Sequence, residues 1–351
     1  MKLPTTKLSL LFILCIFMVF ESCTTPVQKA KNNYLKFSEN ILNYHQTPSK
    51  KFDKNGLMFS DQGAWFAYSL PDSISNVTGF SGPFLMTQQN GVWSSSSLTN
   101  LVLENNKWLS YSSASHNSHL EHTYTFDKFI LKQELVFSSG HTARLKSTLK
   151  STSKTTQSIR YFFKNEPILA DGLQLSSNNN QLTIKSSKTD AIGHVIFPNN
   201  IALKSTDSTY ISNKINIELK PNETKEITIS QTFIFKEYSW ENELKTLQNT
   251  SFDLVLSARK TAKNKELKRL IENRKEQFSS AIYAEVLAKS QLTLQNNWRI
   301  PAGEIKFEGL FPSYHYKWFN GFWSWDSWKH AVGLSYYNTT LAKNQMKLMF
   351  D

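Results

Sequence analysis

The chain has 351 residues, of which 40% are hydrophobic and 13% aromatic, a composition that excludes a disordered chain and a length that allows more than one domain. Lysine and arginine give a net charge of +12, which alone would suggest a nucleic-acid partner. The basic residues are spread along the chain, however, and the one dense stretch, 259–275, is interrupted by Glu266 and Glu272. We therefore expect a solvated helix face there and no nucleic acid among the partners.

The first residues predict a secretory leader. Two lysines precede an uncharged apolar run, Leu8–Phe20, which is too short to cross a bilayer as a permanent helix and fits a signal peptide of residues 1–22. Cys23 follows a small residue, the position at which bacterial signal peptidase cleaves lipoproteins and the cysteine is acylated. We therefore predict a cell-envelope protein attached to the membrane through a lipid anchor at Cys23. Resemblance to Gram-negative lipoproteins favours the outer membrane, since Thr24 and not an acidic residue follows.

The middle of the chain has the pattern of a β-sandwich. Residues 23–55 are polar and lysine-rich and are expected to form a tether, with a short helix near 34–44. From 56 to 237, short apolar runs alternate with polar positions and are separated by Ser, Asn, Gly and Asp clusters, which predicts strands. The clearest runs are 123–137, 158–163, 182–185, 215–219 and 226–235. Since no helix-period segment separates them, the strands should pair antiparallel in a large sandwich.

Beyond Tyr238 the periodicity becomes helical. We predict a helical linker over 238–278 and a further helical region over 279–351. The segments with helical character are 241–248, 254–261, 265–277 and 280–296. The last of them has a broad apolar face, made of Ile282, Val286, Leu287, Leu292 and Leu294. Such a face is expected to pack among other helices.

One stretch, 297–331, differs from the rest because four of the nine tryptophans fall between Trp318 and Trp328. Tryptophans mixed with Asp, Asn, Lys and His suit a surface that is both flat and hydrogen-bonding, as a sugar ring requires. Asp326 is the central polar residue. Ser324 or Asp326 is expected to cap the helix that follows, and the helix dipole favours an ionised carboxylate there. The alternative is that Asp326 is only a helix cap and that the tryptophans pack between helices.

Two segments in this stretch resemble glycoside hydrolase family 63, especially its bacterial members: Gly-Leu-Phe-Pro-Ser at 309–313 and Trp-Phe-Asn-Gly-Phe-Trp-Ser-Trp-Asp-Ser-Trp-Lys-His-Ala at 318–331. The similarity of motifs covers 298–351, and the sandwich before it matches in architecture and order only. The resemblance implies a large antiparallel β-sandwich, a helical linker and a catalytic (α/α)6 toroid, of which this chain contains only the first helices. It also implies an inverting, exo-acting hydrolase of the α-glucosidase type, whose substrate is an α-linked oligosaccharide or a small α-glucoside.

In the family pattern a Trp-Asp pair lies in the subsite that holds the non-reducing sugar. Carried onto this chain, that pair is Trp325 and Asp326, with Trp323, Phe322 and Lys329 as further candidates for substrate binding. His315 and His330 flank the aromatic run and could line the same pocket.

The family's general acid and base, and its calcium loop where present, lie farther along the toroid than Asp351. The resemblance therefore implies no catalytic residue and no cofactor within this chain. Glu304 and Glu308 are expected to be loop or strand residues before the site, and the alternative makes one of them an acid/base partner of Asp326. A second functional hypothesis is a non-catalytic lipoprotein of the cell envelope that binds carbohydrate through the sandwich and the aromatic run.

His116, His119 and His122 are the one cluster that suggests a metal. Their spacing places them on alternating sides of a strand and beyond one shared helix turn. We therefore expect no metal site in this chain.

Overall fold

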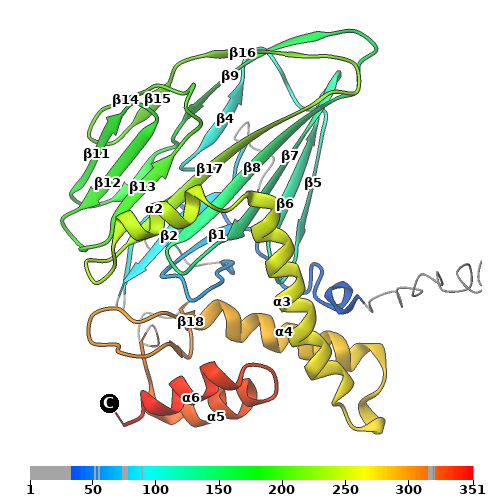
Figure 1. Ribbon diagram of the computed structural model, residues 1–351, viewed down its shortest axis with the longest axis vertical. Helices are drawn as coiled ribbons and strands as arrows, with labels where there is room; N and C mark the ends of the chain where they lie inside the picture. Colours follow the sequence, from blue (N-terminus) through cyan, green and yellow to red (C-terminus); the bar gives the residue numbers. More distant parts are fainter. Residues whose placement is uncertain are drawn as a thin grey trace, which may run out of the picture. The chain divides into compact units, whose positions relative to one another are not determined.

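The computed structural model describes residues 33–50, 53, 56–72, 78–87, 90–314, 319 and 321–350. The chain divides into two units, Met1–Asn33 and Tyr34–Asp351, and all the helices and strands named below belong to the second (Figure 1). The predicted leader and Cys23 lie outside the described residues.

Three sheets make up the β-region. The largest has the strand order β11-β12-β13-β17-β8-β7-β6-β5, the second β1-β2-β3-β10, and the third β14-β15-β9-β16 with β4 also paired to β9. Their paired strands run antiparallel. The bounds are β1 Phe66–Ser69, β2 Ser81–Thr87, β3 Asn90–Ser95, β4 Asn100–Leu103, β5 Ser110–Ser115, β6 Leu120–Thr125, β7 Phe129–Phe137, β8 Thr142–Ser151, β9 Gln157–Lys164, β10 Ile168–Ala170, β11 Leu173–Asn178, β12 Gln181–Ser186, β13 Ile192–Ile196, β14 Leu203–Ser205, β15 Tyr210–Ser212, β16 Ile215–Leu219 and β17 Thr224–Ile234.

The core lies between the large sheet and the two smaller ones. Strand β6 alternates buried and half-buried residues along its whole length, because one face points into the core. Phe66 of β1, Leu131 of β7 and Phe163 of β9 belong to one hydrophobic cluster, so all three sheets share a core. The Phe66 ring lies 4.8 Å from that of Phe233 and 5.3 Å from that of Phe137. The predicted large antiparallel sandwich is confirmed.

Part of the predicted tether is not a tether. Among its described residues, Tyr34–Phe37 form a short 3-10 helix, η1, and Leu42 and Tyr44 are buried in the sandwich core. The backbone carbonyl of Tyr44 accepts a hydrogen bond from Leu70 N at 2.9 Å. Its hydroxyl accepts one from Asn296 Nδ2 at 2.6 Å. The prediction was wrong here because a few apolar residues within a polar segment were enough to anchor it.

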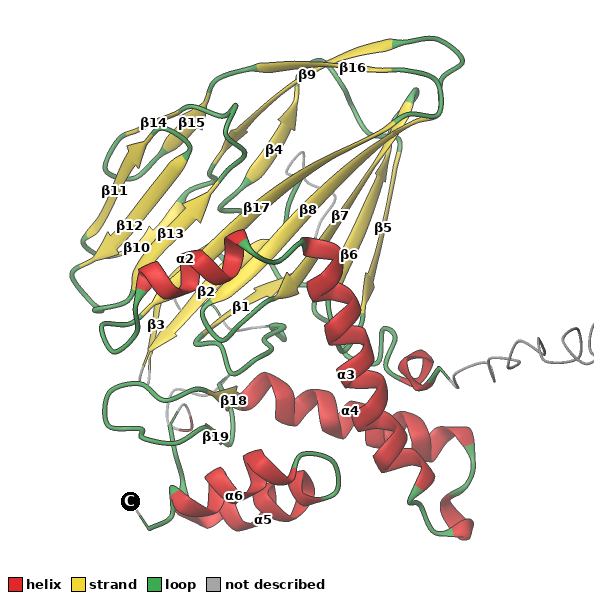
Figure 2. Cartoon of the chain, in the orientation of Figure 1, coloured by secondary structure: helices red, strands yellow, loops and turns green. Residues whose placement is uncertain are grey.

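Helices follow the sandwich (Figure 2). Ser239 and Ser251 cap the first two, accepting hydrogen bonds from Asn242 N and Leu254 N. The two helices predicted over 254–277 are largely one, because no Gly or Pro interrupts the segment. No helix in the described part of the chain is long and apolar enough to span a membrane. The bounds are α2 Trp240–Gln248, α3 Phe252–Glu272, η2 Glu276–Phe278, α4 Ala281–Asn297, α5 Ser324–Ser335 and α6 Thr339–Lys347, with the short strands β18 Trp298–Arg299 and β19 Gly309–Leu310.

A buried ion pair holds α3 to the sandwich region. Asp61, which is fully buried, accepts hydrogen bonds from Arg259 Nε and Nη2, both at 2.9 Å. Lys263 Nζ lies 3.5 Å from the same carboxylate. Beside this network, Phe252 and Val255 of α3 pack on Val136 of the large sheet. Helix α3 is therefore fixed to the large sheet by apolar contact and to the segment before β1 by charge.

The apolar face predicted for α4 is only partly packed. Ala284, Ala288 and Leu292 are buried, the two alanines against Leu267 of α3. Ile282 and Val286, however, are 60% and 54% exposed. The expectation that the whole face packs among helices is thus wrong for the described residues.

Candidate functional site

The aromatic segment is held in place by two buried polar side chains. Tyr314 donates a hydrogen bond from its hydroxyl to Met58 O at 2.7 Å and accepts one from Met58 N at 2.9 Å, which ties the loop before α5 to the sandwich region. Gln345 of α6 accepts from Leu310 N at 2.6 Å and donates to Ser327 Oγ of α5 at 2.9 Å. The start of α5 is therefore held to the sandwich region through Tyr314 and to α6 through Gln345.

The N-terminus of α5 differs from the expectation. Its cap residue is Trp323, which makes no side-chain capping bond, so the prediction that Ser324 or Asp326 caps the helix is wrong. Asp326 instead lies in the first turn, where a carboxylate is favoured by the helix dipole. The hydroxyl of Ser327 donates to Trp323 O at 2.8 Å and accepts the hydrogen bond from Gln345.

The Asp326 carboxylate is half-buried and has no hydrogen bond or ion pair with any other described residue. The interpretation of Asp326 as a helix cap only is therefore not supported. Lys329, one turn away, makes no ion pair with the Asp326 carboxylate. Its Nζ lies over the rings of Trp325 and Trp328, at 4.9 Å and 5.5 Å from their centroids.

His330 is the next polar group on the same face. Its Nδ1 is buried without a hydrogen-bond partner. Burial lowers the pKa of His330, and the charge of Asp326 acts in the opposite direction. His330 is therefore a neutral group beside the unpaired carboxylate at neutral pH. His315 lies outside the described residues.

The aromatic candidates separate into two groups. Trp323 and Trp325 are exposed, the latter by 72%, and the Trp323 ring contacts that of Phe319 at 5.5 Å. Phe322 is half-buried and packs against the sandwich core. The structure therefore places Lys329 on the Trp325 ring, keeps Asp326 in the same helical turn as Trp325, and directs Phe322 elsewhere.

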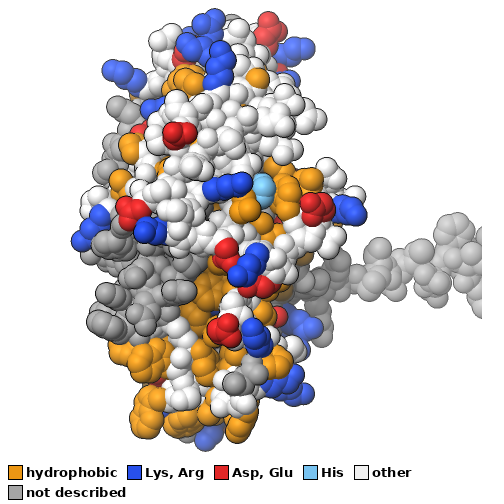
Figure 3. All heavy atoms as spheres, turned by 90° about the vertical axis from the view of Figure 1, so that its left-hand side faces the viewer, with side chains coloured by type: hydrophobic (Ala, Val, Ile, Leu, Met, Phe, Trp, Pro, Cys, Tyr) orange, Lys and Arg blue, Asp and Glu red, His pale blue; other side chains and the backbone are white. Residues whose placement is uncertain are grey.

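An exposed apolar stripe on α5 was not anticipated. Trp325, Trp328, Val332 and Tyr336 recur at helical spacing, and each is at least half exposed. The stripe leads into a groove of about 680 Å3 between α5 and α6, whose wall includes Met346. In Figure 3 hydrophobic side chains gather at the lower end, where these two helices lie in Figure 1. The spacing of three and four residues was the signal that could have identified this face.

The two nearby glutamates differ from each other. Glu304 is fully exposed, with Lys306 Nζ at 4.0 Å from its carboxylate. Glu308 is half-buried, and burial raises its pKa, while Trp298 acts in the opposite direction. Neither makes a hydrogen bond with Asp326 in the described part of the chain.

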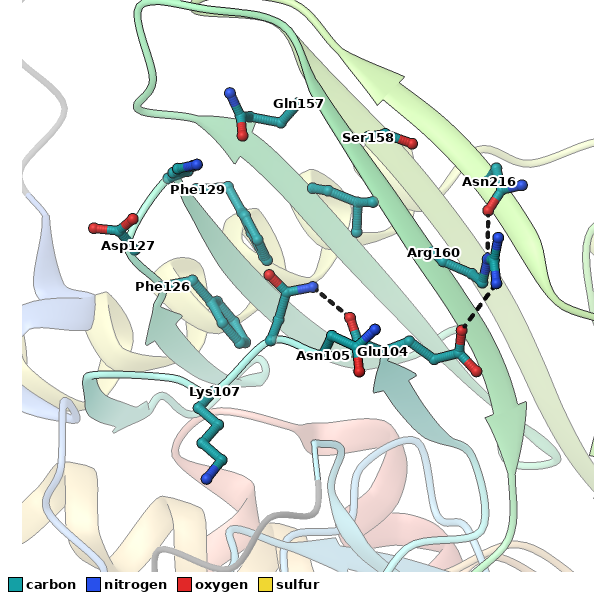
Figure 4. Close-up of a pocket in the computed structure, with 13 residues that line it drawn as sticks. Glu104, Asn105, Lys107, Phe126, Asp127, Phe129, Gln157, Ser158, Arg160 and Asn216 are labelled. Carbon is teal, nitrogen blue, oxygen red and sulfur yellow. Dashed lines mark hydrogen bonds and ion pairs between the residues drawn. The ribbon is translucent and has the colours of Figure 1, made fainter.

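A separate polar cavity of about 590 Å3 lies in the sandwich (Figure 4). Arg160 of β9 donates from Nε to Asn216 Oδ1 at 2.8 Å, and its Nη1 lies 3.6 Å from the carboxylate of Glu104. Lys107 and Asp127 also line the cavity, and no residue of α5 does. Its polar groups are thus partly paired with one another.

The three histidines do not lie on one strand. His116 and His119 are on either side of the β5–β6 turn, and their rings stack with centroids 4.3 Å apart. His122 is buried elsewhere, stacked on Phe80 with Nε2 at 2.9 Å from Gln133 Oε1. The assumption that the spacing keeps all three apart was wrong for His116 and His119, because a hairpin turn folds between them.

Comparison with known proteins points to carbohydrate-active enzymes. Residues 39–186 match the family model described as glucosidase YgjK, N-terminal. The fold is similar to that of a protein described as a kojibiose phosphorylase from the human microbiome, with a TM-score of 0.54 and 12% identity over 87% of this chain and 44% of that one. It is also similar to a family GH92 inverting mannosidase from Bacteroides thetaiotaomicron, with a TM-score of 0.50 and 9% identity over 80% of this chain and 42% of that one.

The structural matches and the family match support different conclusions. At such identities the two structures show a shared fold alone, and the chain spans less than half the length of either. The family match shows that the sandwich region is similar to the N-terminal domain of a glucosidase.

Proposed function

We propose that this chain is the N-terminal part of an inverting glycoside hydrolase of the α-glucosidase type, in which Asp326 and Trp325 form part of the subsite for the non-reducing sugar. The observation that carries the proposal is the half-buried Asp326 carboxylate, which has no partner among the described residues and lies next to an exposed tryptophan. The glucosidase-type match of residues 39–186 supports it.

The chemistry of a pyranose fits this pair. One face of the sugar carries C–H groups that stack on an indole, and its hydroxyl groups donate hydrogen bonds to a carboxylate. A free carboxylate can accept from two hydroxyl groups at once, and an analogue without them would leave its oxygens unpaired. Trp323 and Lys329 would extend this surface on either side.

We place the general acid and base outside the 351 residues. Inversion requires two carboxyl groups about 6.5–9.5 Å apart with space for a water molecule between them. Glu304 is fully exposed beside Lys306, and Glu308 precedes a strand of the β18–β19 pair, so neither is proposed for this role. Further helices of an (α/α)6 toroid would also pack on the exposed Val332 and Tyr336, away from the proposed subsite.

The experiment measures binding of an α-linked glucose disaccharide to the chain by calorimetry or NMR titration. We expect Asp326→Asn and Trp325→Ala to weaken binding at least about tenfold, equivalent to ~1.4 kcal/mol. Tyr336→Ala removes an exposed aromatic at the C-cap of the same helix, more than two turns away, and should leave binding unchanged. Equal affinities in all three variants would remove Asp326 from the site. Release of glucose by this chain alone would refute the placement of the acid and base.

The second candidate is a non-catalytic carbohydrate-binding protein of the cell envelope. The polar cavity of the sandwich favours it, because Glu104, Arg160 and Asn216 offer donors and acceptors on one wall. In the same titration, loss of binding in Arg160→Ala with normal binding in Asp326→Asn would select this alternative.

We also propose that the chain is lipid-anchored in the cell envelope through Cys23, on the evidence of its sequence. Metabolic labelling with a fatty acid should label the wild-type protein and not the Cys23→Ala variant. An unlabelled wild-type protein would rule out the anchor.

A further inference from the structure

We propose that His116, His119 and Glu121 bind a divalent transition-metal ion, with Zn²⁺ preferred, at the β5–β6 turn. This site is independent of the proposed function. The turn is tight, since His116 N donates to His119 O at 3.0 Å, and it places both imidazoles beside the carboxylate of Glu121 on β6. Two imidazoles and a carboxylate are a ligand set that Zn²⁺ takes in proteins, with water as the fourth ligand.

The distances are close to those of a bound ion. The three ligand atoms lie within 4.8 Å of one another, with His119 Nε2 at 3.5 Å and His116 Nε2 at 4.0 Å from Glu121 Oε2. Bond lengths of about 2.0–2.2 Å in a tetrahedron place neighbouring ligand atoms about 3.3 Å apart. His119 and Glu121 therefore need almost no movement to share an ion, whereas the ring of His116 must turn.

His119 is oriented as a metal ligand usually is. Its Nδ1 lies 3.0 Å from Ser118 Oγ, while its Nε2 faces Glu121 Oε2 at 3.5 Å. A hydrogen bond at one ring nitrogen that directs the other at the ion is how proteins fix the ring and tautomer of a ligating histidine.

His116 would rotate on binding. The two rings are stacked with planes only 7° apart, and an ion cannot lie in both planes at once. The side chain of His116 is 21% exposed, and the only ion pair it makes in the described part of the chain is with Glu121. A rotation about its side-chain torsions is therefore open to it.

Lys132 is the cation that pairs with the Glu121 carboxylate in this structure. Its Nζ lies 2.9 Å from Glu121 Oε2 and 3.0 Å from Glu134 Oε1. When a metal takes the Glu121 oxygen, Lys132 keeps Glu134 as its counter-charge. The positive charges of Lys132 and of Lys260 repel a metal ion at this site, so the metal affinity should rise when the charge of Lys132 is removed.

The position of the site suggests what the ion does. Gln295 of α4 donates to Asn117 O, within the turn, at 3.0 Å. Both side-chain polar atoms of Asn117 are buried without partners. An ion at this turn would therefore fix the part of the sandwich on which α4 rests.

The test uses the full-length chain without a histidine tag and Zn²⁺ alone as the probe, in competition with a chromophoric chelator and with Mg²⁺ in excess. We expect one equivalent of Zn²⁺ to bind. Glu121→Gln and His119→Ala should weaken the affinity at least about tenfold, and Lys132→Met should strengthen it severalfold. His194→Ala, which removes a half-buried histidine outside the cluster, should not change it.

The opposite results would overturn the site. These are no tightly bound equivalent in the wild-type chain, or equal affinities in Glu121→Gln and His194→Ala. Circular dichroism checks that each variant is folded. If His119→Ala does not fold, the partly exposed His116→Ala is measured in its place, with the same expected loss.

Discussion

The sandwich and the α5–α6 helix pair are both rich in aromatic residues, yet they use them in opposite ways. In the sandwich, Phe66, Tyr68 and Phe137 are buried and pack ring against ring at 5.3–6.1 Å. On α5 and at its C-cap, Trp325 and Tyr336 are 72% and 64% exposed. The difference shows that the environment, and not the aromatic content, separates residues that build the fold from residues that are available to recognise something.

Replacing one ring in each region should give the largest contrast. We expect Phe66→Ala to lower the free energy of unfolding by about 3–5 kcal/mol, because it removes a ring from a close-packed core and leaves a cavity. Trp325→Ala should change it by no more than about 0.5 kcal/mol, since that side chain is mostly in solvent.

Denaturant unfolding of both variants measures the contrast. A strongly destabilised Trp325→Ala would mean that this indole is part of the packed structure, and it would remove the basis of the comparison.

A buried histidine of the sandwich should make its stability depend on pH. Burial lowers the pKa of His122 to about 3, while in the unfolded chain it returns to about 6.5. Between these values the unfolded state binds a proton that the folded state does not, so stability is complete above about pH 6.5 and is lost as the pH falls.

At ~1.4 kcal/mol per pKa unit, lowering the pH from about 6.5 to about 4.5 should cost on the order of 2–3 kcal/mol through this residue. The measurement is the difference in unfolding free energy between the wild-type chain and His122→Gln at each pH, which cancels the acid sensitivity of other groups such as Glu121. Parallel pH profiles for the two proteins would contradict the prediction.

The fold was largely predictable from local patterns, because period-two alternation and the absence of helical segments are strong signals. The run 123–137 nevertheless contains two strands, β6 and β7, since the turn at 126–129 between them carries aromatic residues and no Gly or Pro. Long-range pairing was not predictable. The burial of Asp61 depends on Arg259, which is almost two hundred residues away, and no local pattern encodes that contact.

The candidate site shows the same division. The motif indicated Trp325 and Asp326, and the structure leaves both available to a ligand. The direction of Phe322 toward the core could not be inferred, because it depends on the loop that enters α5. The spacing of His116 and His119 would keep their side chains apart on a continuous strand. The turn between them instead brings the two rings into contact.

A smaller effect should distinguish two serine caps in the helical region. Ser251 accepts a hydrogen bond from Leu254 N at 3.2 Å, whereas Ser280 occupies the same position of α4 and makes no side-chain capping bond. Ser251→Ala should therefore cost about 1 kcal/mol and Ser280→Ala clearly less. Thermal unfolding of the pair is the measurement, and equal losses would mean that the capping bond of Ser251 contributes nothing.

The contacts of Tyr44, Met58 and Asp61 have a practical consequence for anyone who shortens the gene. The partners of these three residues are Asn296, Tyr314 and Arg259, all beyond the last strand of the sandwich. A fragment that ends near residue 237 would leave the Asp61 carboxylate without Arg259. It would also leave the Tyr44 hydroxyl without Asn296 and the Met58 backbone without Tyr314. A soluble piece for biophysics should therefore keep the polypeptide at least through Tyr314, even when only the β-strands are of interest.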